Sequence, residues 1–248
     1  MPISQPARAV IWLLECKSVS YELINTMPGG RGSNGTKHAS YLKKFPMGTV
    51  PSLSYGDDIY ISESHAIMSF LADKYGWDDF YPKNLASRSR INAYLHWHHR
   101  NTREITIGLF APTMRPDIKF SESQIELSTK AVSKVLNYIE TLLNVRSWLC
   151  TSSSPRYCYF FFLFFNLHAR THTHIYIHSI ADLSAYCEIG QCQKKFCDLI
   201  DFKPYPNIRQ WMVRCESIPG YETSHAMLKA MSPRIRKRVQ KKKNQSRL

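Results

Sequence analysis

The sequence lacks several features that would mark particular classes of protein. No stretch reaches the roughly 18–20 consecutive apolar residues that a membrane-spanning helix needs, and the N-terminus lacks the basic region and apolar run of a secretory signal. None of the seven cysteines falls in a C-x-x-C pair, and the spacing of Cys187, Cys192 and Cys197 fits neither a zinc motif nor a disulfide framework. These absences predict an intracellular protein in a reducing compartment, with no membrane partner.

Acidic residues are also scarce, since 33 Lys and Arg stand against 19 Asp and Glu, a net charge of +14. More than half of this excess lies in residues 232–248, which contain no acid and carry Arg234, Arg236, Lys237, Arg238, Lys241, Lys242, Lys243 and Arg247. No base-stacking platform or groove-reading motif accompanies these cations. We therefore interpret 232–248 as a solvated basic tail rather than a folded basic face, and expect no nucleic-acid partner.

The first 76 residues carry both helical and extended patterns. Apolar spacing and turn residues predict a helix over 6–17 capped by Ser4, a strand over 19–24, strands over 51–54 and 59–61, and a helix over 62–75. Beyond Gly76 the strand patterns stop, and the predicted elements are helices over 85–109, 123–145, 179–196, 205–217 and 221–231. We therefore expect an α/β domain over 1–76 and an all-helical domain over 77–231.

Four short motifs follow one another along these two parts. They are Ser4-Gln5-Pro6-Ala7-Arg8-Ala9-Val10, Val50-Pro51-Ser52-Leu53, Glu63-Ser64-His65-Ala66-Ile67 and Ser179-Ile180-Ala181-Asp182-Leu183. Together with Trp97-His98-His99 on the first long helix, their order and spacing resemble a theta-type glutathione transferase, in particular the plant members. The resemblance implies a thioredoxin-like domain followed by a helical domain, a homodimer, and glutathione as co-substrate without a metal.

The resemblance gives Ser4 the role of the activating serine. A glutathione thiol has a pKa near that of free cysteine, so little of it is thiolate at pH 7. A hydroxyl donor at the positive end of a helix stabilises the thiolate and lowers that pKa. Read without the family, Ser4 is an ordinary N-cap. Arg103 resembles an arginine that points into the active site, and a surface arginine is the alternative.

The same resemblance implies a glutathione site in the first domain. The X–Pro bond equivalent to Val50–Pro51 is cis in the family, and Val50 N–H and C=O would pair with the cysteinyl part of glutathione like an added strand. The helix start at Ser64 would hold the γ-glutamyl carboxylate, and Glu63 would face the ammonium. A strand-starting proline and an ordinary helix start are the structural alternatives.

Further residues complete or weaken this expected site. Gln5 and His38 would also contact glutathione, although a loop histidine such as His38 is as readily just solvated. Thr49 stands where theta members usually have a lysine, which weakens the predicted grip. The spacing of His96, His98 and His99 puts His96 and His98 on different faces, and no carboxylate or cysteine joins the three, so we assign no metal. We expect Ser179 and Asp182 to form a structural capping box.

Two features depart from the family pattern. Family members have a strand before the activating serine, inside the sheet, and no such strand precedes Ser4. We therefore expect either a start at an internal Met or a product that folds poorly. Residues 156–178 join an aromatic run to Arg-Thr-His-Thr-His-Ile-Tyr-Ile-His, which a CA/TA microsatellite after a pyrimidine tract would encode. We hypothesise that 156–178 is a translated intron whose removal keeps the frame.

The expected reaction is attack by the bound glutathione thiolate on an electrophile or on a hydroperoxide oxygen. The alternative is a non-catalytic, degenerate relative or a mis-assembled gene product. The chain ends in Ser246-Arg247-Leu248, which differs from the peroxisomal Ser-Lys-Leu address by one basic exchange. We expect import into peroxisomes by the receptor for that address, or a cytoplasmic protein. A nuclear signal in the Lys/Arg cluster is the rival interpretation.

Overall fold

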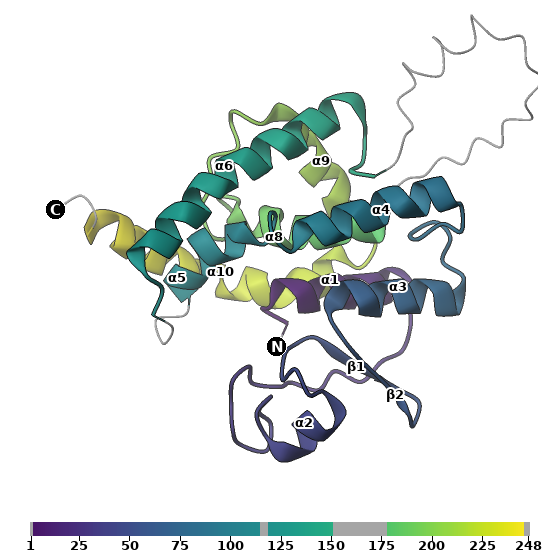
Figure 1. Cartoon of the computed structure of the whole chain (residues 1–248). Coiled ribbons are helices and arrows are strands. Elements are labelled where there is room, and N and C mark those ends of the chain that lie inside the picture. The colour runs from purple at the N-terminus through teal and green to yellow at the C-terminus, as the bar shows by residue number, and fades with distance from the viewer. Residues whose placement is uncertain (1, 115–118, 151–177, 246–248) are drawn as a thin grey trace, which may run out of the picture.

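The computed structural model describes residues 2–114, 119–150 and 178–245 (Figure 1). Except for His178, the hypothesised intron lies outside the described residues, and so does the C-terminal tripeptide 246–248. The N-terminal part contains helix α1 (Gln5–Cys16), helix α2 (Ala39–Lys44), strands β1 (Ser52–Tyr55) and β2 (Ile59–Ser62), and helix α3 (Ser64–Tyr75). This part confirms the predicted helices at both ends and the predicted hairpin between them.

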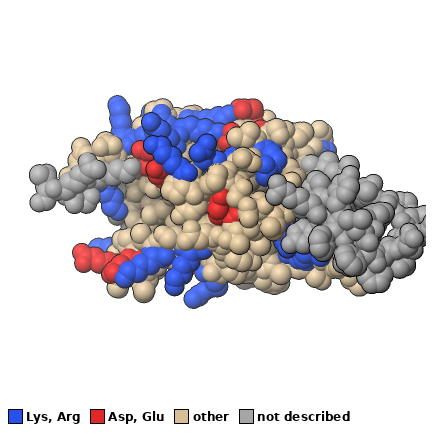
Figure 2. All heavy atoms as spheres, turned by 90° about the horizontal axis from the view of Figure 1, so that it is seen from above, with Lys and Arg blue, Asp and Glu red and all other residues tan. Residues whose placement is uncertain are grey.

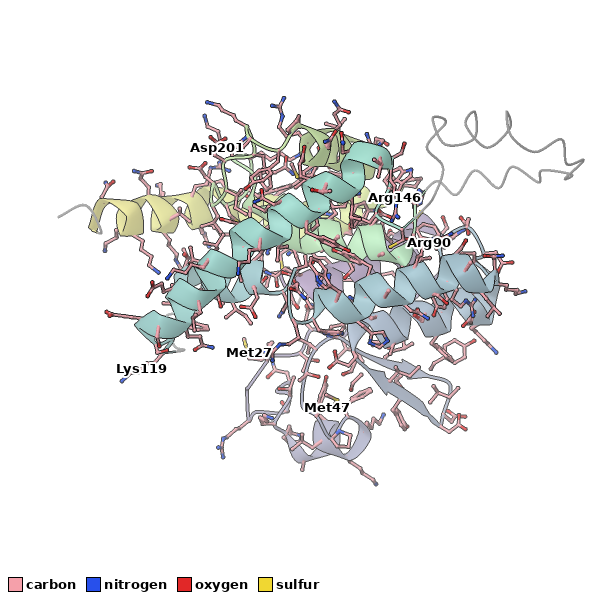
Figure 3. The ribbon with its side chains drawn as sticks, turned by 45° about the horizontal axis from the view of Figure 1, so that its top comes forward. Met27, Met47, Arg90, Lys119, Arg146 and Asp201 are labelled. Atoms are coloured by element: carbon pink, nitrogen blue, oxygen red, sulfur yellow. The ribbon has the colours of Figure 1, made fainter. Side chains whose placement is uncertain are left out.

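The hairpin is antiparallel, with Ser52 opposite Ser62 and Tyr55 opposite Ile59. Gly56 lies in the turn at a φ of 62°, a conformation that glycine adopts without steric cost. Figure 1 shows the hairpin and α2 on one side of α1 and α3, with the larger helical part on the other. Figure 3 places Met27 and Met47 on the hairpin side, and both are exposed. Val50 and Ser64 from the hairpin side and Ser184 from the helical part line one pocket between these two parts.

The strand predicted over 19–24 was wrong. Residues 20–26 make no backbone–backbone hydrogen bond with any described residue, and Leu23 and Ile24 are 45% and 71% exposed. An alternating pattern forms a strand only when a neighbouring strand accepts its hydrogen bonds. Among the described residues the sheet has two strands, β1 and β2, which pair with each other. Residues 19–24 therefore have no neighbouring strand to pair with.

The helical part begins with α4 (Leu85–His98), followed by the π-helical segment η1 (Thr106–Phe110) and α5 (Ala111–Met114). The single helix predicted over 85–109 is therefore broken at 99–103. Two local bonds explain the break: Asn101 Nδ2 donates to the Trp97 carbonyl, at 2.8 Å, and Arg103 N–H reaches back to the His98 carbonyl. Such bonds compete with the regular helical pattern, and the break turns Arg103 toward helix α8.

The remaining helices are α6 (Glu122–Val145), α8 (Ile180–Ile189) with a short 3-10 turn η2 (Gly190–Cys192), α9 (Pro206–Glu216) and α10 (Tyr221–Gln245). Every residue of α8 is buried, as expected of a helix at the centre of a core. Buried Asp182 accepts hydrogen bonds from Ser179 N–H and Oγ, Leu149 N–H and Trp211 Nε1. The predicted structural role of this box is confirmed.

Helix α10 extends well beyond the expected end at residue 231. Leu228, Ile235 and Val239 are buried at helical spacing, and Arg236 Nη1 donates to the Lys195 carbonyl at 2.5 Å. Residues 232–245 are therefore a folded helix with an apolar seam rather than a separate solvated segment. Figure 2 shows Lys and Arg spread over the face that it presents, with few Asp and Glu between them. No helix among the described residues is long and apolar enough to cross a bilayer.

Candidate functional site

A pocket of about 180 Å³ lies where the hairpin side meets the helical part. Its walls come from the start of α1, the segment before β1, the start of α3, the end of α4 with the turn after it, and the second half of α8. The lining residues are Pro6, Thr49, Val50, Pro51, Glu63, Ser64, His65, His98, His99, Arg103, Ser184 and Glu188. Three of the four sequence motifs contribute directly to these walls, so the structure brings together residues that are far apart in sequence.

Val50, Pro51, Glu63 and Ser64, the residues predicted to hold glutathione, all line the pocket. The Val50–Pro51 bond is cis, and Val50 N–H and C=O make no hydrogen bond with described residues. Glu63 has a φ of 73°, an uncommon conformation for a residue other than glycine, and precedes the first helical residue, Ser64. The free backbone groups of Val50, which could pair with an extended peptide, and the N-terminus of α3 thus border the same pocket.

Ser4 occupies the N-cap position of α1, as predicted, but its hydroxyl does not cap the helix. The hydroxyl makes no hydrogen bond with any described residue, while the Ser4 carbonyl accepts the Arg8 N–H at 2.9 Å. Ser4 is not itself a lining residue, although Pro6 is. The side chain is therefore free to donate a hydrogen bond at the end of α1 that borders the pocket.

The structure does not bring Gln5 or His38 into the pocket. Gln5 is buried, and its Nε2 donates to Gln191 Oε1 at 2.9 Å. His38 caps α2 instead, where its Nδ1 lies 2.7 Å from Ser40 Oγ. Both side chains have structural partners in this conformation, and their contact with glutathione stays a prediction.

Arg103 lines the pocket and forms an ion pair with Glu188, with 2.5 Å between Nη1 and Oε1. Thr106 Oγ1 donates to the other oxygen of this buried carboxylate. The nearby charge of Glu188 raises the pKa of Arg103. Sequence reasoning missed Glu188, although a glutamate near the end of the largely apolar helix α8 was a signal for a buried ion pair.

Sequence reasoning also missed the wall formed by His65 and His98. The two rings lie 4.9 Å apart between centroids, and His65 Nε2 lies 2.7 Å from Ser184 Oγ. Burial lowers the pKa of His65 to about 3 and that of His98 well below its usual value, so both are neutral at pH 7. No group of three or more His, Cys, Asp and Glu among the described residues is arranged to hold a metal.

Comparison with known proteins gives a consistent result. Residues 1–79 match the family model for the glutathione S-transferase N-terminal domain. Arabidopsis thaliana glutathione S-transferase T3 is 27% identical over 95% of this chain, which spans only 37% of that relative's length. Arabidopsis thaliana T1 is 25% identical over 95% of this chain and 90% of its own.

Solved structures agree with these sequence relatives. Human theta-2, in complex with glutathione, has a TM-score of 0.71 at 22% identity, covering 96% of this chain and 88% of its own. A Nilaparvata lugens delta-class enzyme has a TM-score of 0.73 at 21% identity, with 96% of each chain covered. The chain has the glutathione transferase fold, a thioredoxin-like part followed by a helical part. The predicted resemblance to the theta-type transferases, plant members included, is confirmed.

Proposed function

We propose that the protein activates glutathione as a thiolate, for conjugation to electrophiles or for reduction of organic hydroperoxides. The observation that carries this proposal is the pocket itself. Val50, Glu63 and Ser64 line it, and it borders the helix end that carries the free hydroxyl of Ser4. Relatives whose names state glutathione transfer support the same reaction class.

Glutathione would bind with its backbone against the free N–H and C=O of Val50, like a short added strand. Its γ-glutamyl carboxylate would lie at the N-terminus of α3, where unpaired backbone N–H groups and the Ser64 hydroxyl favour an anion. The carboxylate of Glu63 would face the ammonium of the same γ-glutamyl group. Thr49 supplies no charge to this site, so we expect weaker binding than with a lysine there.

The thiol would then lie beside Ser4 at the N-terminus of α1. Its proton is lost to solvent, and the Ser4 hydroxyl donates a hydrogen bond to the sulfur anion. In conjugation, the sulfur bonds to the electrophilic carbon as the leaving group departs. In peroxide reduction, the sulfur bonds to the terminal peroxide oxygen as the O–O bond breaks, and the alkoxide leaves as an alcohol after taking a proton from solvent. A second glutathione then reacts with the sulfenic acid to give a disulfide and water. Arg103 would orient the second substrate or its leaving group, because Glu188 engages only its Nη1 among the described residues.

The test measures glutathione binding by calorimetry and turnover with 1-menaphthyl sulfate and with cumene hydroperoxide. We expect Ser4→Ala to lower kcat by about 10²-fold or more with little change in glutathione affinity, since one donor to the developing charge is lost. Ser64→Ala should instead weaken glutathione binding. Ser54→Ala, an exposed serine outside the pocket, is the matched control. Full turnover in Ser4→Ala would refute the assignment.

A non-catalytic relative is the competing function. Two observations favour it: Thr49 in place of a lysine, and the unpartnered segment 20–26. It predicts glutathione binding with no turnover of either substrate in the wild-type protein. The turnover assay therefore separates the two functions directly.

We further propose a homodimer, and import into peroxisomes through Ser246-Arg247-Leu248. The support for import is the tripeptide's likeness to the receptor-read address, which requires a free C-terminus. Removal of Leu248 alone from a fluorescent fusion should abolish punctate localisation. A nuclear signal in the Lys/Arg cluster would survive that deletion, so an unchanged or solely nuclear pattern contradicts peroxisomal import.

A further inference from the structure

Arg8 lies in α1, one turn after Ser4, and its side chain is completely buried. Arginine is rarely fully buried unless a carboxylate pairs with it. A buried charge without such a partner is costly to the fold and projects a strong field on its surroundings, because no water screens it. The partners of Arg8 therefore decide what this residue does.

Among the described residues, all the hydrogen-bond partners of the Arg8 guanidinium are neutral. Nη1 donates to the Ile3 carbonyl at 2.6 Å. Nη2 donates to the Cys187 carbonyl at 2.8 Å and to Gln191 Oε1 at 3.1 Å, while Nε has no partner among the described residues. Gln5 Nε2 donates to the same Gln191 oxygen and fixes its orientation. We call these three acceptors, the Ile3 and Cys187 carbonyls and Gln191 Oε1, the Arg8 cage. They hold the cation through their dipoles and carry no negative charge to compensate it.

The titratable groups that face Arg8 do not neutralise it either. Burial raises the pKa of Cys187 and Cys197 to about 12 and that of Cys192 well above its usual value, and lowers the pKa of His225 to about 2. All four are uncharged at pH 7. Glu188 lies on the same helix as Cys187, but its oxygens are taken by Arg103 and Thr106.

We propose that Arg8 is a positioning and electrostatic residue for glutathione activation: its uncompensated charge lowers the pKa of the thiol at Ser4, and its bond to Ile3 fixes the backbone that presents Ser4. This inference rests on the proposed function. The guanidinium touches the carbonyl bonded to Ser4 N, so the sulfur would lie about 10 Å from the charge. At an effective dielectric constant of about 20, one charge at that distance changes a pKa by roughly 1.

Gln191→Glu tests the charge without removing Arg8. It places a carboxylate oxygen where Gln191 Oε1 now accepts from Arg8, and the bond that it removes is the long one from Gln191 Nε2 to Thr106 Oγ1, at 3.5 Å. Arg8→Gln removes the charge. Arg8→Lys keeps the charge but loses the branched guanidinium that bonds to the Ile3 and Cys187 carbonyls and to Gln191. Gln210→Glu, an exposed glutamine on α9, introduces the same charge change away from the cage.

The readouts are the pKa of the bound glutathione thiol, from the ultraviolet absorbance of its thiolate, and the pH profile of kcat/KM. We expect Gln191→Glu and Arg8→Gln to raise that pKa by roughly 1 and to lower kcat/KM about tenfold on the acidic limb, with recovery at alkaline pH. Arg8→Lys and Gln210→Glu should keep the wild-type pKa. Gln191→Glu should also raise Tm, because it pairs the buried cation.

A purely structural Arg8 would give different results. The loss of kcat/KM would be the same at every pH, and Arg8→Lys would have the same loss as Arg8→Gln. Gln191→Glu would leave the thiol pKa unchanged. Any of these results overturns the proposal. Should Arg8→Gln fail to fold, Gln191→Glu still decides. A wild-type protein that binds no glutathione would refute the proposed function itself, whereas an unchanged pKa in Gln191→Glu with normal binding refutes only the role of Arg8.

Discussion

Truncation of Ile235 tests whether the basic C-terminal segment is part of the folded core. Ile235 is 1% exposed and lies on α10 between the buried residues Leu228 and Val239. Ile→Ala substitutions in cores cost about 2–5 kcal/mol, through lost burial and the cavity left behind. Because α10 is the last described helix and can relax at its end, we expect the lower part of that range, about 2–3 kcal/mol.

The assay is urea unfolding followed by circular dichroism, with a parallel thermal melt. A loss of 2–3 kcal/mol corresponds to a Tm lower by roughly 5–10 °C in a chain of this size. Lys237→Ala, exposed two residues further along the same helix, is the matched control and should change stability by less than about 0.5 kcal/mol. Equal stability of Ile235→Ala and Lys237→Ala would refute the packed helix and restore the solvated tail.

Three further predictions follow from the core and the sequence. The pKa of buried His225 is lowered to about 2, so its stabilising contribution is present above the unfolded value near 6.5 and is lost as pH falls from there toward 2. His225 alone should lower the unfolding free energy by up to about 1.4 kcal/mol per pH unit between pH 6 and 4. The pH dependence should be less steep in His225→Gln, and a pH-independent urea midpoint would contradict this. Asp182→Ala should cost about 3 kcal/mol or more, because Leu149 N–H and Trp211 Nε1 lose their shared acceptor; a wild-type urea midpoint would contradict the structural role. A transcript lacking the codons for 156–178 should exist and give the more soluble product, and detection of only the full-length message with soluble, active protein would remove the intron hypothesis.

The fold was predictable where the local sequence pattern also determines which segment an element pairs with or where it ends. The hairpin β1–β2 needs only its own turn, and α3 begins at a motif and ends at Gly76, where φ is 67°. The prediction of a strand over 19–24 was wrong because alternating apolar residues indicate which face would be buried but do not show whether a neighbouring strand exists. The end of α10 was missed because its basic residues masked the buried spacing of Leu228, Ile235 and Val239.

The candidate site was predictable in its motif residues and in Arg103, which also lines the pocket. Val50, Glu63 and Ser64 could be found because each lies at a recognisable strand or helix start. Glu188 could not be paired with Arg103 from the sequence, because that contact joins two helices distant along the chain. The cage around Arg8 likewise depends on how α8 packs against α1, which no local pattern records.

The most direct test of the central claim is the pKa of the glutathione thiol bound to wild-type protein and to Ser4→Ala, read from thiolate absorbance across a pH titration. Free thiols of this kind have a pKa near 8.5. We expect a pKa clearly below that value in the wild type and one at least about 1 higher in Ser4→Ala, with similar glutathione affinity. The same pKa in both proteins, or a wild-type value no lower than that of free glutathione, would contradict thiolate stabilisation by Ser4.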